Sequence, residues 1–297
     1  MRSKLIMKVS IIGAGNVGAM VASRIVDAGL ADIVLMDIVP GLAKAKAMDI
    51  SDARPIVNST SGITGTERFE DIRDSDIVVV TAGLSRRPGE SRDELLKKNA
   101  QILKDISGYI KKYCATPIVI VVTNPLDAMT YLIMKETGFH PRRVIGMAGA
   151  LDSARFINMV SERTTSVDRD NIFMMGSHGD TMVAINRSKG LSSDEFTECS
   201  DATRKRGAEI VGLLKTGSAY FAPSAAVFYM LKCILKDEKK ICCVSAYLQG
   251  QYGESDIYIG VPVLLGSSGV KDIVEIPLAE KEKKAFKKSA QEIRKSI

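Results

Sequence analysis

The chain has 297 residues, of which 45% are hydrophobic and 26% charged, a composition that is typical of globular proteins and excludes a disordered or fibrous chain. No run reaches the roughly 18 apolar residues of a membrane span, and the first residues, MRSKLIMKVSII, lack the apolar core and cleavage site of a signal peptide. The net charge of +6 is concentrated in residues 281–295, where acidic side chains are interleaved and apolar ones recur at helical spacing, so a solvated helix is favoured over a nucleic-acid site.

In the first half of the chain, short runs rich in Val and Ile alternate with helical stretches. Nearly continuous apolar runs are typical of parallel strands that are buried on both faces. Their alternation with helices predicts a Rossmann-type, doubly wound α/β domain over residues 1–147. The expected strands are residues 8–12, 33–37, 77–81, 118–123 and 144–147, and the expected helices include 17–27 and 93–112.

After about residue 147 the pattern changes to helices that flank strand-like runs. It predicts a second, α+β domain over residues 148–297 that carries chemistry, and the lack of a linker indicates that the two halves pack tightly. The expected helices are residues 153–162, 203–216 and 222–236, and the expected strands are 171–175, 182–186, 241–247 and 256–265.

The five cysteines show no metal-ligand spacing and are odd in number. They therefore predict neither a disulfide framework nor a metal site, and a reducing, cytoplasmic compartment is expected. The adjacent Cys242 and Cys243 lie in an apolar run and are expected in a buried strand.

A glycine-rich turn joins the first expected strand to the first expected helix. In such a turn the first glycine permits a tight bend, the second lets the backbone approach a pyrophosphate, and the third allows the helix to pack on the strand. Asp37 ends the next strand, where a carboxylate can accept the ribose hydroxyls and repel the 2′-phosphate of NADP, so NAD is the expected cofactor. The alternative is a plain glycine turn followed by a capping aspartate. The residues of the turn are Gly13, Ala14, Gly15, Asn16, Val17 and Gly18.

Two places in the second half are candidates for chemistry. His178 lies in the loop GSHGD between two apolar runs, where the neighbouring glycines leave room for a substrate. Asp152 and Arg155 are three residues apart, which on a helix places a carboxylate and a guanidinium on one face. Taken singly, Asp152 and Arg155 could instead form a structural ion pair and His178 could be structural. His140, in a turn-like GFHPRR, is interpreted as structural.

Further candidates lie in the first half. The segment 86–92, RRPGESR, follows the third expected strand, and its arginines resemble a mobile anion clamp, although solvated loop charges are the simpler interpretation of them in isolation. Asn124 ends the fourth expected strand, at the carboxyl edge where ligands of such sheets bind.

The order of these motifs resembles the lactate/malate dehydrogenase family, and more narrowly its lactate-dehydrogenase-like malate dehydrogenases. The likeness covers nearly the whole chain and is carried by GAGNVG, TAGLSRRPGESRDELL, VVTNP, GMAGALDSARF, GSHGDTMV, GSAYFAPSAA and YGESDIYIGVPV. It implies reversible oxidation of L-malate to oxaloacetate with NAD, a place in the tricarboxylic acid cycle, and a homo-oligomer, either a dimer or a tetramer.

The resemblance also implies roles for the candidate residues. His178 would accept the proton in malate oxidation and, as imidazolium, donate it in the reverse direction, while Asp152 would orient its ring and raise its pKa. Arg155 would hold the C1 carboxylate, Arg92 would polarise the reacting carbonyl, and Arg86 would bind the second carboxylate. Asn124 would contact both substrate and nicotinamide, and the remaining residues near the cofactor would be Asn99, Val122 and Thr123.

Two other kinds of function are the alternatives, a lactate or other 2-hydroxy acid dehydrogenase and a non-catalytic relative. A lactate dehydrogenase would share every part except the residue that binds the second carboxylate, and Arg86 argues against it. A non-catalytic NAD-binding or nucleic-acid-binding relative would not need His178, Asp152, Arg155 and Arg92 together. Two departures from the family pattern are Ser177, where glycine or an acidic residue is expected, and a short segment 186–208; the second puts subunit contacts in doubt more than chemistry.

Overall fold

A nine-stranded sheet forms the centre of the described part of the chain. The structure, a computed structural model, describes residues 7–84, 92–187 and 190–297. The strand order is β11-β10-β9-β6-β5-β4-β1-β2-β3, and the pairs from β3 to β6 are all parallel. These six strands are β1 Lys8–Ile12, β2 Asp32–Met36, β3 Ile63–Thr66, β4 Ile77–Val80, β5 Ile118–Val121 and β6 Val144–Gly146.

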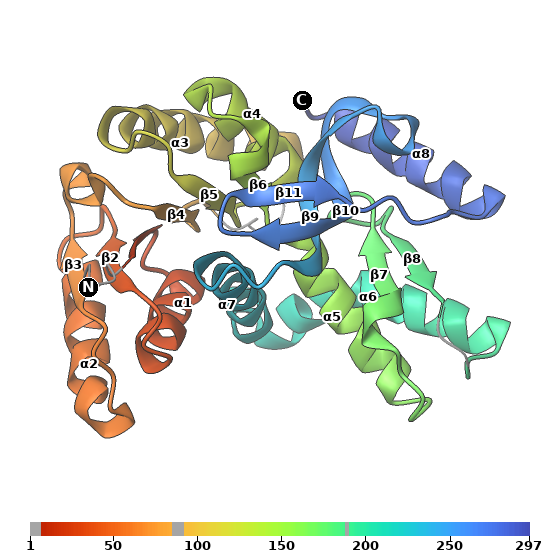
Figure 1. The fold of residues 1–297 in the computed structure, drawn as a ribbon, viewed down its shortest axis with the longest axis horizontal. Helices are drawn as coiled ribbons and strands as arrows, with labels where there is room; N and C mark the ends of the chain where they lie inside the picture. Colours follow the sequence, from red (N-terminus) through yellow and green to blue (C-terminus); the bar gives the residue numbers. More distant parts are fainter. Residues whose placement is uncertain (1–6, 85–91, 188–189) are drawn as a thin grey trace.

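Helices cover both faces of this parallel part, as the continuous Val and Ile runs of its strands require. In Figure 1, α3 and α4 lie above the sheet, and α1, α2 and α7 lie below it. Ile11 and Val79 face the α1 and α7 side, whereas Ile12 and Val80 face the α3 and α4 side, so each strand contributes to two apolar cores. The helices are α1 Asn16–Asp27, α2 Leu42–Val57, α3 Arg92–Tyr113, α4 Leu126–Thr137 and α7 Phe221–Leu235.

The second half of the chain extends the same sheet. Strand β9 joins β6 in antiparallel sense where Ser245 pairs with Gly146, and β10 and β11 continue outward. A separate hairpin of β7 and β8 touches this sheet through a bridge between Gly176 and Gly260. The elements are α5 Ala148–Ser161, β7 Ile172–Met175, β8 Val183–Asn186, α6 Ser193–Leu214, β9 Lys240–Gln249, β10 Ser255–Gly266, β11 Gly269–Ile273 and α8 Glu280–Arg294.

The predicted Rossmann-type sheet is confirmed, since β3-β2-β1-β4-β5-β6 is the order of a doubly wound dinucleotide fold. The division at residues 147 and 148 stays a prediction, and β9 to β11 lie in the same sheet as β1 to β6 rather than in a separate one. Helix α6 begins at Ser193, ten residues before the expected start at 203, because Ser192 and Glu195 form a capping box. Among the described residues, no helix is long and apolar enough to cross a membrane.

Candidate active site

The glycine turn between β1 and α1 has the geometry that only glycine permits at two of its positions. Gly13 has φ +108°, and a Cβ there would lie 2.6 Å from the backbone nitrogen of Ala82. A Cβ on Gly18 would overlap the carbonyl oxygen of Gly13, so the helix can pack on the strand only without a side chain. Gly15 is exposed, and a Cβ there would meet no atom of the described residues. Gly13 and Gly18 therefore leave no room for a side chain, whereas Gly15 faces open space.

The N-terminus of α1 fits an anion. Gly15 is its N-cap, its first turn holds no acidic residue, and no side chain of the described residues caps it. The first backbone N–H groups of a helix lack partners within the helix and lie at the positive end of its dipole. Asn16 and Val17, which begin the helix, reach solvent here, and Ala14 is buried behind them. The residues present therefore fit a pyrophosphate group.

Asp37 follows β2 and lines a cavity of about 580 Å³. Its two carboxylate oxygens accept the N–H groups of Ala14 at 2.6 Å and Val39 at 3.0 Å. The carboxylate thus braces the glycine turn, as the capping alternative supposes, while each oxygen keeps a lone pair that can accept a ribose hydroxyl. The cavity is mostly apolar and runs from Gly13 and Asp37 to Ile102 and Tyr109 of α3, which suits an adenosine group.

The loops after β4 and β5 are tied together by buried side chains. Asn99 of α3 is fully buried; its side chain accepts the N–H of Leu84 at 2.8 Å and donates to the carbonyl oxygens of Leu84 and Asn124 at 3.1 and 2.7 Å. Thr123 donates from its hydroxyl to the carbonyl of Ala82 at 2.6 Å. The side chains of Asn99 and Thr123 therefore fix the backbone of the loops after β4 and β5.

In the same region Asn124 is exposed and Val122 is half-buried. Both lie just after β5, at the carboxyl edge of the sheet. A contact of Asn99 with the cofactor stays a prediction.

The structure brings His178, Asp152 and Arg155 together. His178 follows β7, and its Nδ1 lies 2.7 Å from Oδ2 of Asp152 on α5. Burial alone would lower the pKa of His178, but the charge and hydrogen bond of Asp152 outweigh it, and the pKa is raised above its ordinary value. Nδ1 therefore carries the proton that faces Asp152, which leaves Nε2 as the nitrogen for a ligand.

Arg155 lies one turn after Asp152 on α5. Its Nη1 is 3.6 Å from Oδ1 of Asp152, and its side chain is only 12% exposed. Among the described residues its guanidinium makes no hydrogen bond, and the buried Oδ1 of Asp152 likewise accepts none. Burial lowers the pKa of Arg155, although Asp152 has the opposite effect. Keeping this guanidinium charged in the partly buried site therefore opposes folding. A planar, partly buried guanidinium with unused donors fits a carboxylate in bidentate geometry.

Asp127 is a residue that the sequence analysis missed. It lies in the first turn of α4, its side chain is buried, and its Oδ2 accepts the backbone N–H of His178 at 2.9 Å. Its Oδ1 accepts the hydroxyl of Ser245 on β9 at 2.6 Å. A signal was present in the sequence, since Asp127 is the one charged residue in the apolar run LDAMTYLIM.

Other predicted residues are placed only in part. Arg86, together with its neighbour Arg87, lies outside the described residues. Arg92 begins α3, and nothing is described of its side chain.

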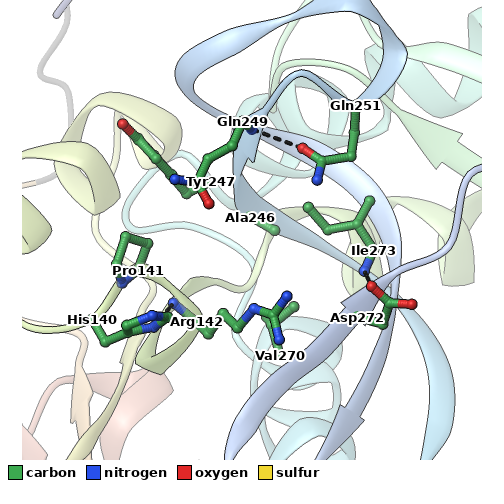
Figure 2. A pocket seen from close by; sticks show the side chains of 10 residues that line it. All are labelled: His140, Pro141, Arg142, Ala246, Tyr247, Gln249, Gln251, Val270, Asp272 and Ile273. Carbon is green, nitrogen blue, oxygen red and sulfur yellow. Dashed lines mark hydrogen bonds between the residues drawn. The ribbon is translucent and has the colours of Figure 1, made fainter.

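His140 is structural, as expected: its Nδ1 accepts the N–H of Arg142 at 3.2 Å and caps a short 3₁₀ helix, Pro141–Arg143. The small hollow beside it, shown in Figure 2, is lined on one side by His140, Pro141 and Arg142 and on the other by residues of β9 and β11. Its volume of about 30 Å³ holds no more than about one or two waters.

The strand order and the glycine turn together define a dinucleotide-binding α/β protein. Models of the lactate/malate dehydrogenase family agree: the NAD-binding domain matches residues 7–146 and the alpha/beta C-terminal domain matches residues 149–297. The malate dehydrogenase of Shouchella clausii (strain KSM-K16) is 44% identical over 299 residues, which cover 97% of this chain and 95% of that one. The chain belongs to the lactate/malate dehydrogenase family, whose curated relatives are NAD-dependent oxidoreductases.

Two solved structures from Cryptosporidium parvum show whether the fold alone separates malate dehydrogenases from lactate dehydrogenases. Its malate dehydrogenase superposes with a TM-score of 0.93 at 35% identity, covering 98% of each chain. Its lactate dehydrogenase, complexed with lactic acid and nicotinamide adenine dinucleotide, gives 0.94 at 36% identity, covering 99% of this chain and 98% of that one. The fold is therefore common to both activities, and substrate choice depends on particular side chains.

Proposed function

We propose that the chain catalyses the reversible oxidation of L-malate to oxaloacetate with NAD. The observation that carries the proposal is the group on α5 and in the loop after β7: an imidazole held by Asp152 at 2.7 Å, beside a partly buried guanidinium that makes no hydrogen bond among the described residues. A proton acceptor next to a carboxylate receptor is what a 2-hydroxy acid needs for oxidation. The malate dehydrogenase relative, 44% identical over nearly its full length, supports the choice of malate.

In this proposal Arg155 binds the C1 carboxylate of malate through two parallel hydrogen bonds and so fixes the orientation of C2. Nε2 of His178 accepts the proton of the C2 hydroxyl, and Asp152 stabilises the imidazolium that results. When bound, NAD supplies the acceptor for the hydride that leaves C2. In the reverse direction the same imidazolium donates its proton to the carbonyl oxygen of oxaloacetate. Its raised pKa favours this direction near neutral pH.

The cofactor would lie along the carboxyl edge of the sheet. The N-terminus of α1, at Gly15 and Asn16, would bind the pyrophosphate, and Asp37 would accept hydroxyls of the adenosine ribose. Asn124 would lie beside the nicotinamide and the substrate. A carboxylate at position 37 repels a 2′-phosphate, so NAD should be used in preference to NADP.

Lactate is the second candidate substrate, because a lactate dehydrogenase superposes on the chain as well as a malate dehydrogenase does. The proposed discriminator is Arg86, which would bind the second carboxylate of malate and would have no partner beside the methyl group of lactate. Arg92 would polarise the reacting carbonyl. Both assignments come from the sequence resemblance.

The direct test is to follow NADH absorbance with oxaloacetate and, separately, with pyruvate, and to repeat the oxaloacetate reaction with NADPH. The proposal requires rapid NADH oxidation with oxaloacetate, a much slower reaction with pyruvate, and a strong preference for NADH. Faster turnover of pyruvate would identify a lactate dehydrogenase. Equal efficiency with NADPH would remove the role given to Asp37.

A homo-oligomer, either a dimer or a tetramer, is part of the proposal. Large apolar side chains are exposed on helices below the sheet in Figure 1, among them Met48 and Ile56 of α2, Leu213 of α6 and Phe221 of α7. Single exposed apolar side chains are common on protein surfaces, so the oligomer is expected from the family resemblance and these side chains are only compatible with it. Light scattering should therefore give a multiple of the 32.2 kDa chain mass. A cytoplasmic location and a place in the tricarboxylic acid cycle remain part of the same proposal.

A further inference from the structure

A second carboxylate, Asp127, lies buried behind the proposed acid–base group. Its side chain is on α4, whereas Asp152 is on α5, so the two acids approach His178 from different helices. Among the described residues no lysine or arginine forms an ion pair with Asp127. Burying a carboxylate without a cation opposes folding, and a neutral side chain of the same shape would avoid that penalty. An acid in such a place points to a role in function.

The two hydrogen bonds of Asp127 show which parts of the chain it connects. Oδ2 accepts the backbone N–H of His178 at 2.9 Å, and Oδ1 accepts the hydroxyl of Ser245 at 2.6 Å. Ser245 is fully buried and pairs with Gly146, where β9 joins β6. Asp127 therefore connects the main chain of His178 to the centre of the sheet, while Asp152 holds the ring.

We propose that Asp127 is a positioning residue for His178, which anchors the main chain of the histidine and whose negative charge favours the imidazolium form. The inference rests on the proposed function in that His178 is taken as the acid–base group. Asp152 then fixes the orientation and the tautomer of the ring, and Asp127 fixes the position of the main chain that carries the ring.

Among the described residues, few charges face His178. Asp152 and Arg155 face it from α5 and Asp127 faces it from α4, while Arg206 of α6 acts on Arg155. Asp180 follows in the same loop and is exposed. From β9 come the neutral hydroxyl of Ser245 and the thiol of Cys243, whose pKa burial raises. Removing the charge of Asp127 thus removes one of the two buried anions that the described residues place beside the imidazole.

The variant Asp127→Asn separates charge from geometry. The amide oxygen of Asn can accept the N–H of His178, and its NH₂ group can donate to the hydroxyl oxygen of Ser245, because a hydroxyl both donates and accepts. Both contacts of position 127 are therefore kept and the negative charge is lost. Asp194→Asn is the matched control, since Asp194 also occupies the first turn of a helix, α6, but is exposed and is not among the groups that act on the pKa of His178.

The pKa of His178 is the first measurement, made by NMR without substrate. The chain has two histidines, so His140 serves as the internal reference. In Asp127→Asn the pKa of His178 should fall while that of His140 stays unchanged, and Asp194→Asn should alter neither. A His178 pKa equal to that of the wild type would overturn the inference.

The second measurement is the pH profile of oxaloacetate reduction. The Asn variant should lose about three- to tenfold of kcat at pH 8 and recover most of it near pH 6, with an unchanged KM for NADH. An equal loss at every pH would assign Asp127 a structural role only and would contradict the charge effect. If the wild type did not reduce oxaloacetate at all, the proposed function would fail, whereas the NMR measurement would still decide the role of Asp127.

Discussion

At the scale of single residues, the site depends on how charges surround one imidazole. Asp152 and Asp127 raise the pKa of His178 against the effect of burial, and Arg155 lowers it. The raised pKa favours the protonated ring, which is the acid that oxaloacetate reduction needs. Since the folded chain binds this proton more tightly than the unfolded chain, His178 stabilises the fold below its unfolded pKa. That contribution is lost as the pH rises through the folded value.

Asp152→Asn should move the pH optimum of oxaloacetate reduction toward acid. The amide can still accept the N–H at Nδ1, so the ring stays in place, but the charge that favours the imidazolium is gone. We expect kcat at pH 8 to fall by about 10²–10⁴-fold, the range attributed to positioned proton transfer. The profile of kcat against pH, from pH 5 to 9, checks this. An unchanged profile with a normal rate would mean that Asp152 has a structural role.

Arg86→Gln should change substrate choice. The proposed pairing of Arg86 with the second carboxylate would be lost, and so would the penalty of leaving a cation beside the methyl group of pyruvate. Such a penalty is worth several kcal/mol, or a discrimination of about a thousandfold. We expect kcat/KM to fall for oxaloacetate and to rise for pyruvate, with Arg87→Gln as the control. If the ratio of the two efficiencies stayed constant, Arg86 would not be the specificity residue.

The site residues differ in how clearly the sequence marks them. His178, Asp152 and Arg155 could be found because their types and spacing alone suggest chemistry, and the structure brings them together. Asp127 was missed although it is the one charged residue in an apolar run, because its partner, a backbone N–H 51 residues away, leaves no mark on the spacing of residue types. Asn99 was expected beside the cofactor. Its contacts with the backbone of Leu84 and Asn124 could not be predicted, because they depend on the loop conformation.

At the scale of elements, hydroxyl groups link the loop that carries His178 to helix α8. Ser289 of α8 is fully buried, and its Oγ accepts the N–H of Ser177 at 2.7 Å. Thr181 lies within hydrogen-bond distance of both Ser177 and Ser289, at 2.7 and 3.1 Å. A Cβ on Gly176, which has φ +85°, would lie 2.6 Å from the same Ser289 hydroxyl. The unexpected Ser177 thus belongs to a network that fixes the loop from behind.

Ser289→Ala should weaken both the fold and the reaction. It leaves the buried N–H of Ser177 without its acceptor, which costs about 1–3 kcal/mol. We expect a lower free energy of unfolding in urea and a lower kcat, because the His178 loop gains freedom. Ser107→Ala is the matched control: Ser107 is equally buried, yet its hydroxyl has no partner among the described residues. Equal losses in the two variants would exclude a specific effect of the network.

Most strands were predicted to within a few residues because their apolar runs are nearly continuous. Strands β3, ITGT, and β11, GVKDI, were not predicted, since neither is a continuous apolar run. Helix α2, with Asp49, Asp52 and Pro55, lacks a clear apolar stripe, whereas α4 is buried over most of its length and reads as a nearly continuous apolar run; neither helix was predicted. The start of α6 depends on a capping box in a polar stretch that reads as a loop. That β9 would join β6 could not be predicted, since pairing between distant strands leaves no local pattern.

At the scale of the whole molecule, the buried carboxylate of Asp127 lowers stability. Burial raises its pKa to about 6, although Ser245 and His178 act in the opposite direction. The folded state therefore holds the proton more tightly than the unfolded state, whose Asp pKa is about 3.9. Stability is greatest when Asp127 is protonated and falls as the pH rises from about 4 to about 6. The penalty at pH 8 is of the order of 3 kcal/mol.

Asp127→Asn should consequently be more stable than the wild type while it is less active. The amide keeps both hydrogen bonds and is neutral at every pH, so the variant should unfold at a higher urea concentration at pH 8. The advantage should shrink between pH 6 and pH 4, as the wild-type acid takes up its proton. Urea titrations at pH 8 and pH 4 check this. A variant that is less stable at pH 8 would show that the charge is needed for folding.

The network behind His178 also bears on the order in which the protein is made. The loop at 176–181 is held by Ser289, which is synthesised 112 residues after Ser177, and by Gly260 of β10. The glycine turn, Asp37 and the six parallel strands all precede residue 147. Because chains tend to fold from the N-terminus during synthesis, the cofactor half emerges first, but the sheet face at Ile11 and Val79 stays partly uncovered until α7 has been made. The loop of His178 is the last part to be fixed, because it also needs α8.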